Sequence, residues 1–191
     1  REGAALHPAL SLMWKGLGTG CAVLMALLGA LPHGQARWLC VAALALCTAA
    51  DVVLGINFTL GMGVFLLGHL CYIGWFICQA TPSASHAAFT LPLMVIAALV
   101  LFRWSRYMTP EQRLPFAVYA LVLCIMAGFA LATAWHIRSL PTLLAALGAL
   151  LFLLSDMMVC REVLMPVSKA FDRSAMAIYY AAQLILALGC M

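Results

Sequence analysis

The sequence predicts an all-α protein, a polytopic bundle of transmembrane helices that forms a single domain over residues 1–191. Hydrophobic residues make up 66% of the chain, and the mean hydropathy is +1.09. Only 8% of the residues are charged, whereas about a quarter would be charged in a water-soluble domain. The apolar residues form runs long enough for helical spans, and the alternating pattern of barrel strands is absent. Together these features predict helices that cross a lipid bilayer.

Seven apolar segments are the expected spans, because most of them approach the ~20 residues that a ~30 Å hydrocarbon core requires. In chain order they are Trp14–Leu31, Ala36–Ile56, Leu60–Ala80, Ala87–Phe102, Leu114–Trp135, Leu140–Cys160 and Ala175–Cys190. The preceding stretch, Arg1 to Met13, fits either part of a further span or an interfacial segment. Because the chain begins with arginine and shows no secretory signal peptide, we expect a processed or shortened amino terminus.

The breaks between these spans contain turn-forming residues, which justify the seven segments one after another. In order, the breaks are Pro32-His33-Gly34, Asn57, Thr81-Pro82-Ser83, Thr109-Pro110-Glu111, Ser139 with Pro141, and the polar stretch from Ser168 to Arg173. Proline recurs in them because it lacks the backbone N–H that a helix interior needs. We therefore expect separate helices joined by short loops.

The distribution of lysine and arginine predicts the orientation of the bundle. The order of the spans assigns each loop to one of the two membrane faces. The face that contains the loop between the first two spans carries Arg37 and Arg138. The opposite face carries Arg1, Lys15, Arg103, Arg106, Arg113, Arg161, Lys169 and Arg173. Lysine and arginine are enriched in cytoplasmic loops, so the second face is expected to be cytoplasmic.

Two aspartates, Asp51 and Asp156, lie inside the apolar stretches CTAADVVLG and LLFLLSDMMV. A charge at the centre of a membrane span costs roughly 2.5–3.5 kcal/mol on insertion scales, so intramembrane carboxylates usually serve a function. Neither aspartate has a lysine or arginine nearby within its span. The usual functions are an ion path, a proton relay, a ligand counter-ion or acid–base chemistry.

Other polar residues are expected at the same depth as the aspartates. At a rise of 1.5 Å per residue, they occupy a layer roughly 6–18 Å below the cytoplasmic boundary. The layer contains Asp51, His69, Tyr72, Ser155, Asp156, Tyr179, Tyr180 and Gln183. His69 and Tyr72 share a helix face, as do Tyr180 and Gln183. The coincidence predicts one polar cavity that opens to the cytoplasmic leaflet.

Single members of this layer also have structural explanations. A lone histidine, tyrosine or glutamine in a span is often an interhelical hydrogen-bonding partner, and Ser155 is able to bond back to a carbonyl one turn earlier. The paired aspartates suit general acid–base hydrolysis, since two carboxylates in one site ionise one at a time. They equally suit a proton-coupled transporter, and a lipid-binding or scaffold protein is the third alternative.

Several other kinds of site are excluded or disfavoured by the sequence. Eight cysteines form no C-x-x-C pair, and there is no H-E-x-x-H, G-x-S-x-G or phosphate-binding glycine loop, so no metal site is expected. The basic residues lie in short loops, where they act as topology signals, and no nucleic-acid partner is expected. We expect the remaining histidines to face water; they are His7, His33, His86 and His136.

Four short pieces of the chain, taken in order, make a more specific pattern. They run from Ala49 to Leu54, from Gly61 to Tyr72, from Gly148 to Asp156 and from Tyr179 to Leu184. In these pieces the chain resembles the YhhN-type lysoplasmalogenase family. It departs from the family pattern at Ala50, where the family usually has glycine, and at Gly16, where proline often follows the lysine. Family members generally have eight spans, one more than we identify.

The resemblance implies a membrane hydrolase that cleaves the vinyl ether bond of lysoplasmalogens to a fatty aldehyde and glycerophosphoethanolamine or glycerophosphocholine. The substrate would be a lysophospholipid, the other partners would be membrane lipids, and no cofactor is implied. Asp51 and Asp156 are the expected catalytic pair, one acting as the acid and the other as the base, as two carboxyl groups do in glycoside hydrolysis. We take Asp156 as the acid, but the sequence does not distinguish this order from the reverse.

The remaining residues of the layer would bind the substrate. His69, Tyr72, Ser155, Tyr180 and Gln183 are expected to position water or a glycerol hydroxyl. Lys15, near the cytoplasmic boundary, is expected to meet the lipid phosphate. The expected location is a bacterial inner membrane, with the site open to the cytoplasmic side.

Overall fold

The computed structural model describes residues 8–30 and 36–191, with side chains from residue 18 to residue 29 and from residue 36 onward. In this part of the chain there are seven α-helices, one short 3-10 turn and no strands. The helices are α1 (Pro8–Ala30), α2 (Arg37–Leu54), α3 (Phe58–Gln79), α4 (Ala84–Trp104), α5 (Pro110–Ile137), α6 (Leu140–Leu164) and α7 (Lys169–Gly189), with η1 (Ser105–Tyr107) after α4. The all-helical fold is confirmed, and each of the seven predicted spans corresponds to one helix.

The helix ends differ from the predicted spans because polar caps, and not hydropathy, decide where a helix starts. Helix α5 begins at Pro110, behind a capping box in which the Gln112 side chain accepts from the Thr109 N–H at 3.0 Å. Helix α7 begins at Lys169, where the Ser168 hydroxyl accepts from the Phe171 N–H at 3.2 Å. Both helices therefore start before the apolar run does.

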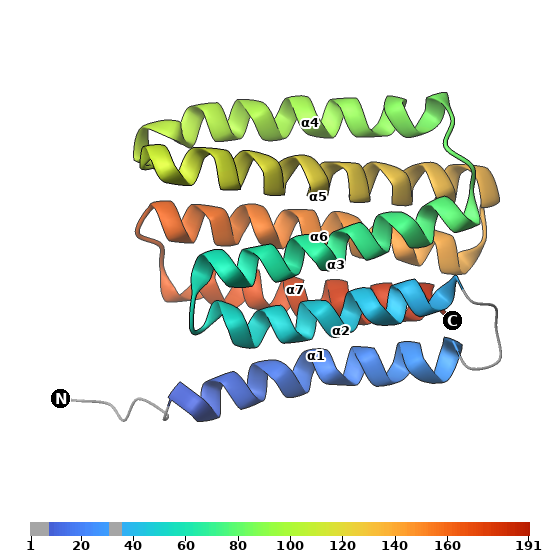
Figure 1. Ribbon diagram of the computed structural model, residues 1–191, viewed down its shortest axis with the longest axis horizontal. Helices are drawn as coiled ribbons and strands as arrows, with labels where there is room; N and C mark the ends of the chain where they lie inside the picture. The colour runs from blue at the N-terminus through green and yellow to red at the C-terminus, as the bar shows by residue number, and fades with distance from the viewer. Residues whose placement is uncertain (1–7, 31–35) are drawn as a thin grey trace.

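The helices lie roughly parallel in one bundle (Figure 1). Helix α4 lies at one edge and packs on α5, while α1 lies at the other and packs on α2 and α7. Helices α2, α3, α5, α6 and α7 form the centre, and α6 and α7 make the most extensive contact. A Cβ on Gly148 of α6 would lie 2.8 Å from the Leu186 side chain of α7, so glycine is what lets these two helices approach.

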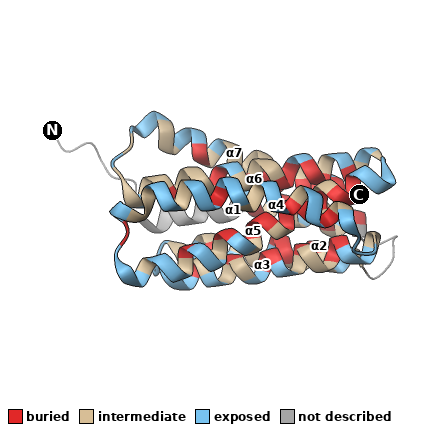
Figure 2. Cartoon of the chain, turned by 90° about the horizontal axis from the view of Figure 1, so that it is seen from above, coloured by how far each residue is buried: buried red, intermediate tan, exposed pale blue. Residues whose placement is uncertain are grey.

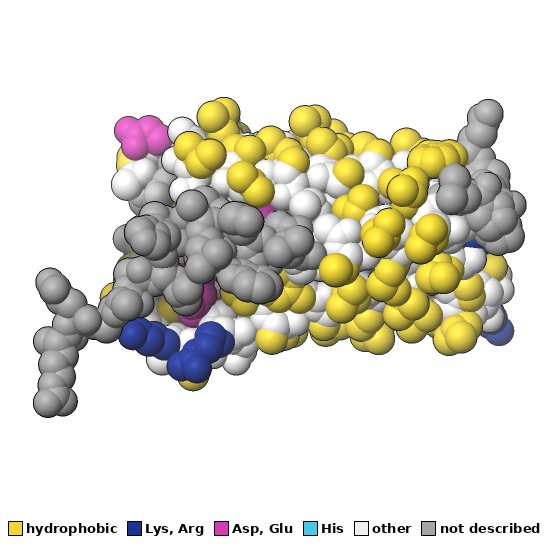
Figure 3. Space-filling view, turned by 90° about the horizontal axis from the view of Figure 1, so that it is seen from below, with side chains coloured by type: hydrophobic (Ala, Val, Ile, Leu, Met, Phe, Trp, Pro, Cys, Tyr) yellow, Lys and Arg dark blue, Asp and Glu magenta, His cyan; other side chains and the backbone are white. Residues whose placement is uncertain are grey.

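Five of the described helices, α2 to α6, are long and apolar enough to cross a membrane. Gly18–Gly29 is a shorter apolar stretch of α1. Helix α7 is less apolar because its first turns hold Lys169, Asp172 and Arg173. Large hydrophobic residues point outward, among them Phe102 with 81% of its surface exposed. Figure 3 shows hydrophobic side chains along one face, with lysine and arginine near its ends. The chain is therefore an integral membrane protein by length and composition.

Buried residues gather in the half of the bundle nearest the C-terminus (Figure 2). The core there contains the large aromatic side chains of Tyr72, Trp75 and Phe76 from α3, together with Phe152 from α6. The opposite end of the bundle is less tightly filled. It is at that end that α2 and α6 finish and that α3, α5 and α7 begin.

The prediction that the boundary histidines face water is correct for one residue and wrong for another. His136 is exposed, as expected, whereas His86 is only 3% exposed. The His86 ring packs against Phe129 of α5, and its Nδ1 accepts from the Ser83 N–H at 3.1 Å. The prediction failed because this face of α4 is turned toward α5. His7 and His33 lie outside the described residues.

Candidate active site

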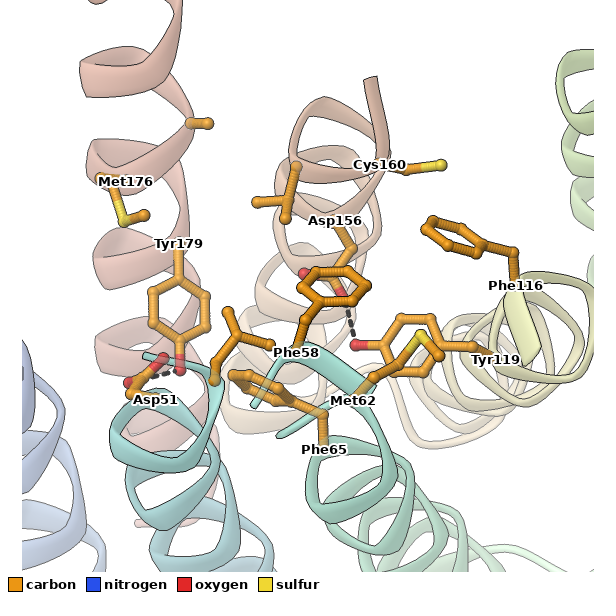
Figure 4. A pocket seen from close by; sticks show the side chains of 13 residues that line it. Asp51, Phe58, Met62, Phe65, Phe116, Tyr119, Asp156, Cys160, Met176 and Tyr179 are labelled. Carbon is orange, nitrogen blue, oxygen red and sulfur yellow. Dashed lines mark hydrogen bonds between the residues drawn. The ribbon is translucent and has the colours of Figure 1, made fainter. Parts of the chain in front are cut away.

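One cavity at the less tightly filled end of the bundle contains both intramembrane carboxylates. About 80 Å³ of it is open to water, enough for several water molecules. The residues that line it are Asp51, Leu54, Phe58, Met62, Phe65, Phe116, Tyr119, Asp156, Val159, Cys160, Ala175, Met176 and Tyr179. Figure 4 shows the two carboxylates on separate sides of this space, each beside a tyrosine. The wall is otherwise apolar, so charges inside it interact more strongly than they would in water.

Both carboxylates lie near the end of the bundle at which α2 and α6 finish. Asp51 lies in the last turn of α2, which ends at Leu54, and Asp156 lies about two turns before the end of α6. Among the described residues, this end also carries Arg103, Arg106, Arg113, Arg161, Lys169 and Arg173. The cavity thus lies toward the end of the bundle that is rich in lysine and arginine.

Asp51 is held by a chain of hydrogen bonds from α7 and α3. The Tyr179 hydroxyl donates to Asp51 Oδ2 at 2.9 Å, and Gln183 Nε2 donates to the same hydroxyl oxygen at 2.9 Å. Behind them, the Tyr72 hydroxyl lies 3.5 Å from Gln183 Oε1, to which it donates. Tyr179 and Gln183 are one helical turn apart and therefore share a face of α7. The chain fixes the direction in which Asp51 points into the cavity.

Asp156 is held by a second, separate chain from α5 and α3. The Tyr119 hydroxyl donates to Asp156 Oδ2, a hydrogen bond drawn as a dashed line in Figure 4. His69 Nε2 lies 3.0 Å from the same tyrosine oxygen and 3.8 Å from Asp156 Oδ2. On α6, the Ser155 hydroxyl bonds back to the Phe152 carbonyl at 2.9 Å and makes only a long contact, 3.5 Å, with Asp156 Oδ1.

The predicted site residues fall into two groups. Asp51 and Asp156 line the cavity, whereas His69, Tyr72, Ser155 and Gln183 are at most 1% exposed and lie behind its wall. His69, Tyr72 and Gln183 are hydrogen-bonded in the chains that hold the carboxylates, whereas Ser155 bonds to the Phe152 carbonyl and makes a long contact with Asp156 itself. Tyr180 is half-buried, lies outside the cavity lining and packs toward Gly18 of α1. The side chain of Lys15 lies outside the described residues.

Two tyrosines that hold the carboxylates were not among the predicted site residues. Tyr179 belongs to the polar layer but is not among the predicted site residues, although it shares a face with Gln183 as Tyr180 does. Tyr119 was missed entirely, although it lies roughly 13 Å into α5 at 1.5 Å per residue. Its depth matches that of the layer, so applying the depth criterion to every span would have found it.

The chemistry available to the cavity is that of carboxylates, tyrosine hydroxyls and water. Among the described residues, no group of three or more histidine, cysteine, aspartate or glutamate side chains is arranged to hold a metal ion. One carboxylate in such a site is able to donate a proton while the other accepts one. Each is oriented by a tyrosine, so the two are positioned independently.

Helices that cross a membrane around a cavity with two carboxylates define an integral membrane protein with an intramembrane acidic site. The chain belongs to the YhhN family, whose family model matches residues 10–190. The resemblance seen in the sequence is therefore confirmed.

Curated relatives give the comparison more detail. Proteins named lysoplasmalogenase from Mycobacterium bovis and Mycobacterium tuberculosis are each 35% identical to this chain over 134 residues. The aligned region covers 65% of this chain and 49% of each relative. The chain thus spans about half the length of the curated relatives it matches. No solved structure matches the chain.

Proposed function

We propose that this protein is a single-domain, membrane-embedded hydrolase that cleaves the vinyl ether bond of lysoplasmalogens. The observation that supports this most strongly is the pair Asp51 and Asp156 in the wall of one apolar cavity, each oriented by a tyrosine hydroxyl. Membership of the YhhN family and the likeness to proteins named lysoplasmalogenase support the same function. The products would be a fatty aldehyde and a glycerophospho-base, formed without a cofactor.

The proposed reaction needs one acid and one base. The acid protonates the β-carbon of the vinyl ether, and the resulting oxocarbenium ion is attacked by water, which gives up a proton to the base. The hemiacetal then collapses to the aldehyde. Its hydroxyl loses a proton, the glycerol oxygen gains one, and the bond between the hemiacetal carbon and the glycerol oxygen breaks. A carboxylate within a low-dielectric cavity stabilises the cation more effectively than water would.

The buried polar residues have a supporting role in this proposal. Tyr72 and Gln183 orient Tyr179, and through it Asp51, while His69 acts on Asp156 through Tyr119. The contacts therefore favour a role in holding the carboxylates over direct contact with substrate. Contact of Ser155 or Tyr180 with the substrate, and of Lys15 with its phosphate, stays a prediction. The location in a bacterial inner membrane, with the cavity facing the cytoplasm, also stays a prediction.

An aldehyde-release assay on the purified protein in detergent tests the proposal. Wild-type protein should release fatty aldehyde from lysoplasmalogen, and Asp51→Asn and Asp156→Asn should each lower the rate on the order of 100-fold or more. Asp172→Asn is the matched control, because it removes a carboxylate that lies outside the cavity lining. Full activity in either cavity variant would remove that aspartate from the mechanism.

A second substrate separates this function from its alternatives. A lysophospholipid with an ester in place of the vinyl ether has no vinyl ether double bond to protonate, so it should be cleaved poorly. Rapid cleavage of the ester would indicate a broader lipase. No aldehyde release from the vinyl ether by folded wild-type protein would rule out the hydrolase and favour a proton-coupled transporter or a lipid-binding protein.

A further inference from the structure

The two hydrogen-bonded chains differ in the second group that hydrogen-bonds to the tyrosine hydroxyl. For Tyr179 this group is the Gln183 amide, and for Tyr119 it is the His69 imidazole. An amide nitrogen only donates hydrogen bonds, whereas each ring nitrogen of an imidazole is able either to carry a hydrogen or to accept one. The carboxylates are therefore alike in their tyrosine contact and unlike in their access to a proton.

The direction of the hydrogen bonds around Asp156 is determined by the single proton of Tyr119. That proton is donated to Asp156 Oδ2, so the tyrosine oxygen is left as an acceptor toward His69. His69 Nε2 must then carry the hydrogen. Both hydrogen bonds point from the imidazole toward the carboxylate, which is the arrangement that a proton transfer in that direction requires.

His69 lies among aromatic side chains, with one ring nitrogen toward Tyr119 and the other unpaired in the part of the chain that the structure describes. The ring is fully buried between Phe65, Phe152 and Tyr119, with centroids 6.4, 4.8 and 5.4 Å away. Its second nitrogen, Nδ1, has no hydrogen-bond partner among the described residues. Burying an unpaired ring nitrogen is costly, and a glutamine would supply the donor to Tyr119 equally well. A histidine at this position has the added ability to hold a proton.

We infer that His69 and Tyr119 form a proton relay for Asp156, which makes Asp156 the acid and Asp51 the base. This inference rests on the proposed hydrolase function. Tyr119 passes its hydroxyl proton to Asp156 and receives one from His69 Nε2, so the tyrosine is unchanged and one proton has moved from imidazolium to carboxylate.

The rest of the cycle returns that proton. Asp156 gives it to the β-carbon, and Asp51 takes a proton from the attacking water and later hands it to the glycerol oxygen. The hydroxyl proton of the collapsing hemiacetal goes to Asp156 and back through Tyr119 to His69. The sum is one water consumed and one vinyl ether bond cleaved.

Two substitutions at His69 separate a relay from a positioning contact. His69→Gln keeps an N–H donor that is able to reach Tyr119, and His69→Leu keeps only comparable bulk. If the relay operates, both variants should lower kcat by on the order of 100-fold, with KM changed less than threefold. If His69 only positions Tyr119, the glutamine variant should keep near-wild-type activity, and that result would overturn the relay.

A double-substitution cycle gives an independent readout. Tyr119→Phe removes one oxygen and keeps the ring, so it should fold and should lower kcat about as much as His69→Leu does. Because the two residues act in series, combining them should cost no more than the larger single effect. Losses that multiply to on the order of 10⁴-fold would contradict the relay.

Failure of this inference is distinguishable from failure of the proposed function. If folded wild-type protein releases no aldehyde, the hydrolase itself is wrong. If wild-type protein is active, both aspartate variants are inactive and His69→Gln is fully active, only the relay is wrong.

Discussion

Tyr179→Phe should uncouple Asp51 from α7 without disturbing the shape of the core. The change deletes the hydroxyl that donates to Asp51 Oδ2 at 2.9 Å and accepts from Gln183 Nε2 at 2.9 Å. A hydrogen bond to a charged group contributes about 1.5–3 kcal/mol, and Nε2 of Gln183, a side chain that is 1% exposed, loses the acceptor that Tyr179 supplies. If that energy orients the carboxylate in the transition state, kcat/KM should fall roughly 10- to 150-fold.

The assay for this prediction is aldehyde release at subsaturating lysoplasmalogen, with circular dichroism to verify helix content. Tyr107→Phe is the matched control, because it deletes the same atom from an exposed tyrosine in η1 that is not part of the cavity lining. The control should keep wild-type activity. A kcat/KM within threefold of wild type for Tyr179→Phe would refute the idea that this hydroxyl positions the base.

Two further predictions concern the bundle itself. Gly148→Ala should lower the free energy of unfolding by about 1–3 kcal/mol, because the new Cβ would lie 2.8 Å from the Leu186 side chain, whereas Gly63→Ala, where a Cβ meets nothing within 4 Å, should not destabilise. Thermal unfolding in detergent measures both, and equal melting temperatures would contradict the packing argument. Asn57→Ala should cost about 0.5–2 kcal/mol, since it removes the side chain that accepts from the Leu60 N–H at 3.1 Å at the start of α3. An unchanged unfolding midpoint would show that this cap adds nothing.

The sequence predicted the number and order of the helices because hydropathy is a property of local composition. It also predicted the depth of Asp51 and Asp156, since depth in a helix follows from counting residues at a constant rise. Both carboxylates indeed line one cavity. The prediction was weaker at helix ends, where α7 starts at Lys169 and not at Ala175, because a capping serine starts a helix regardless of hydropathy.

Hydropathy and residue counting could not predict the rotation of each helix about its own axis. His69 and Gln183 have the depth of the site, yet their side chains lie behind the cavity wall, and Tyr119 at a similar depth faces the cavity. The prediction that His86 faces water failed for the same reason, since a position near a span boundary does not indicate which face of α4 is turned toward α5. In nearly uniform apolar helices, there is too little polar contrast between faces to reveal the rotation from periodicity.

The amino-acid order alone thus determined that this is a helical membrane protein with two acidic groups at one level, since composition and residue spacing are local quantities. Only the tertiary structure decided which tyrosine holds which aspartate, and that an imidazole stands behind one of them and an amide behind the other. Those pairings join α3 with α5 and α6, and α2 with α7, across separations of up to 128 residues. They depend on how the helices pack side by side, which no local pattern in the chain encodes.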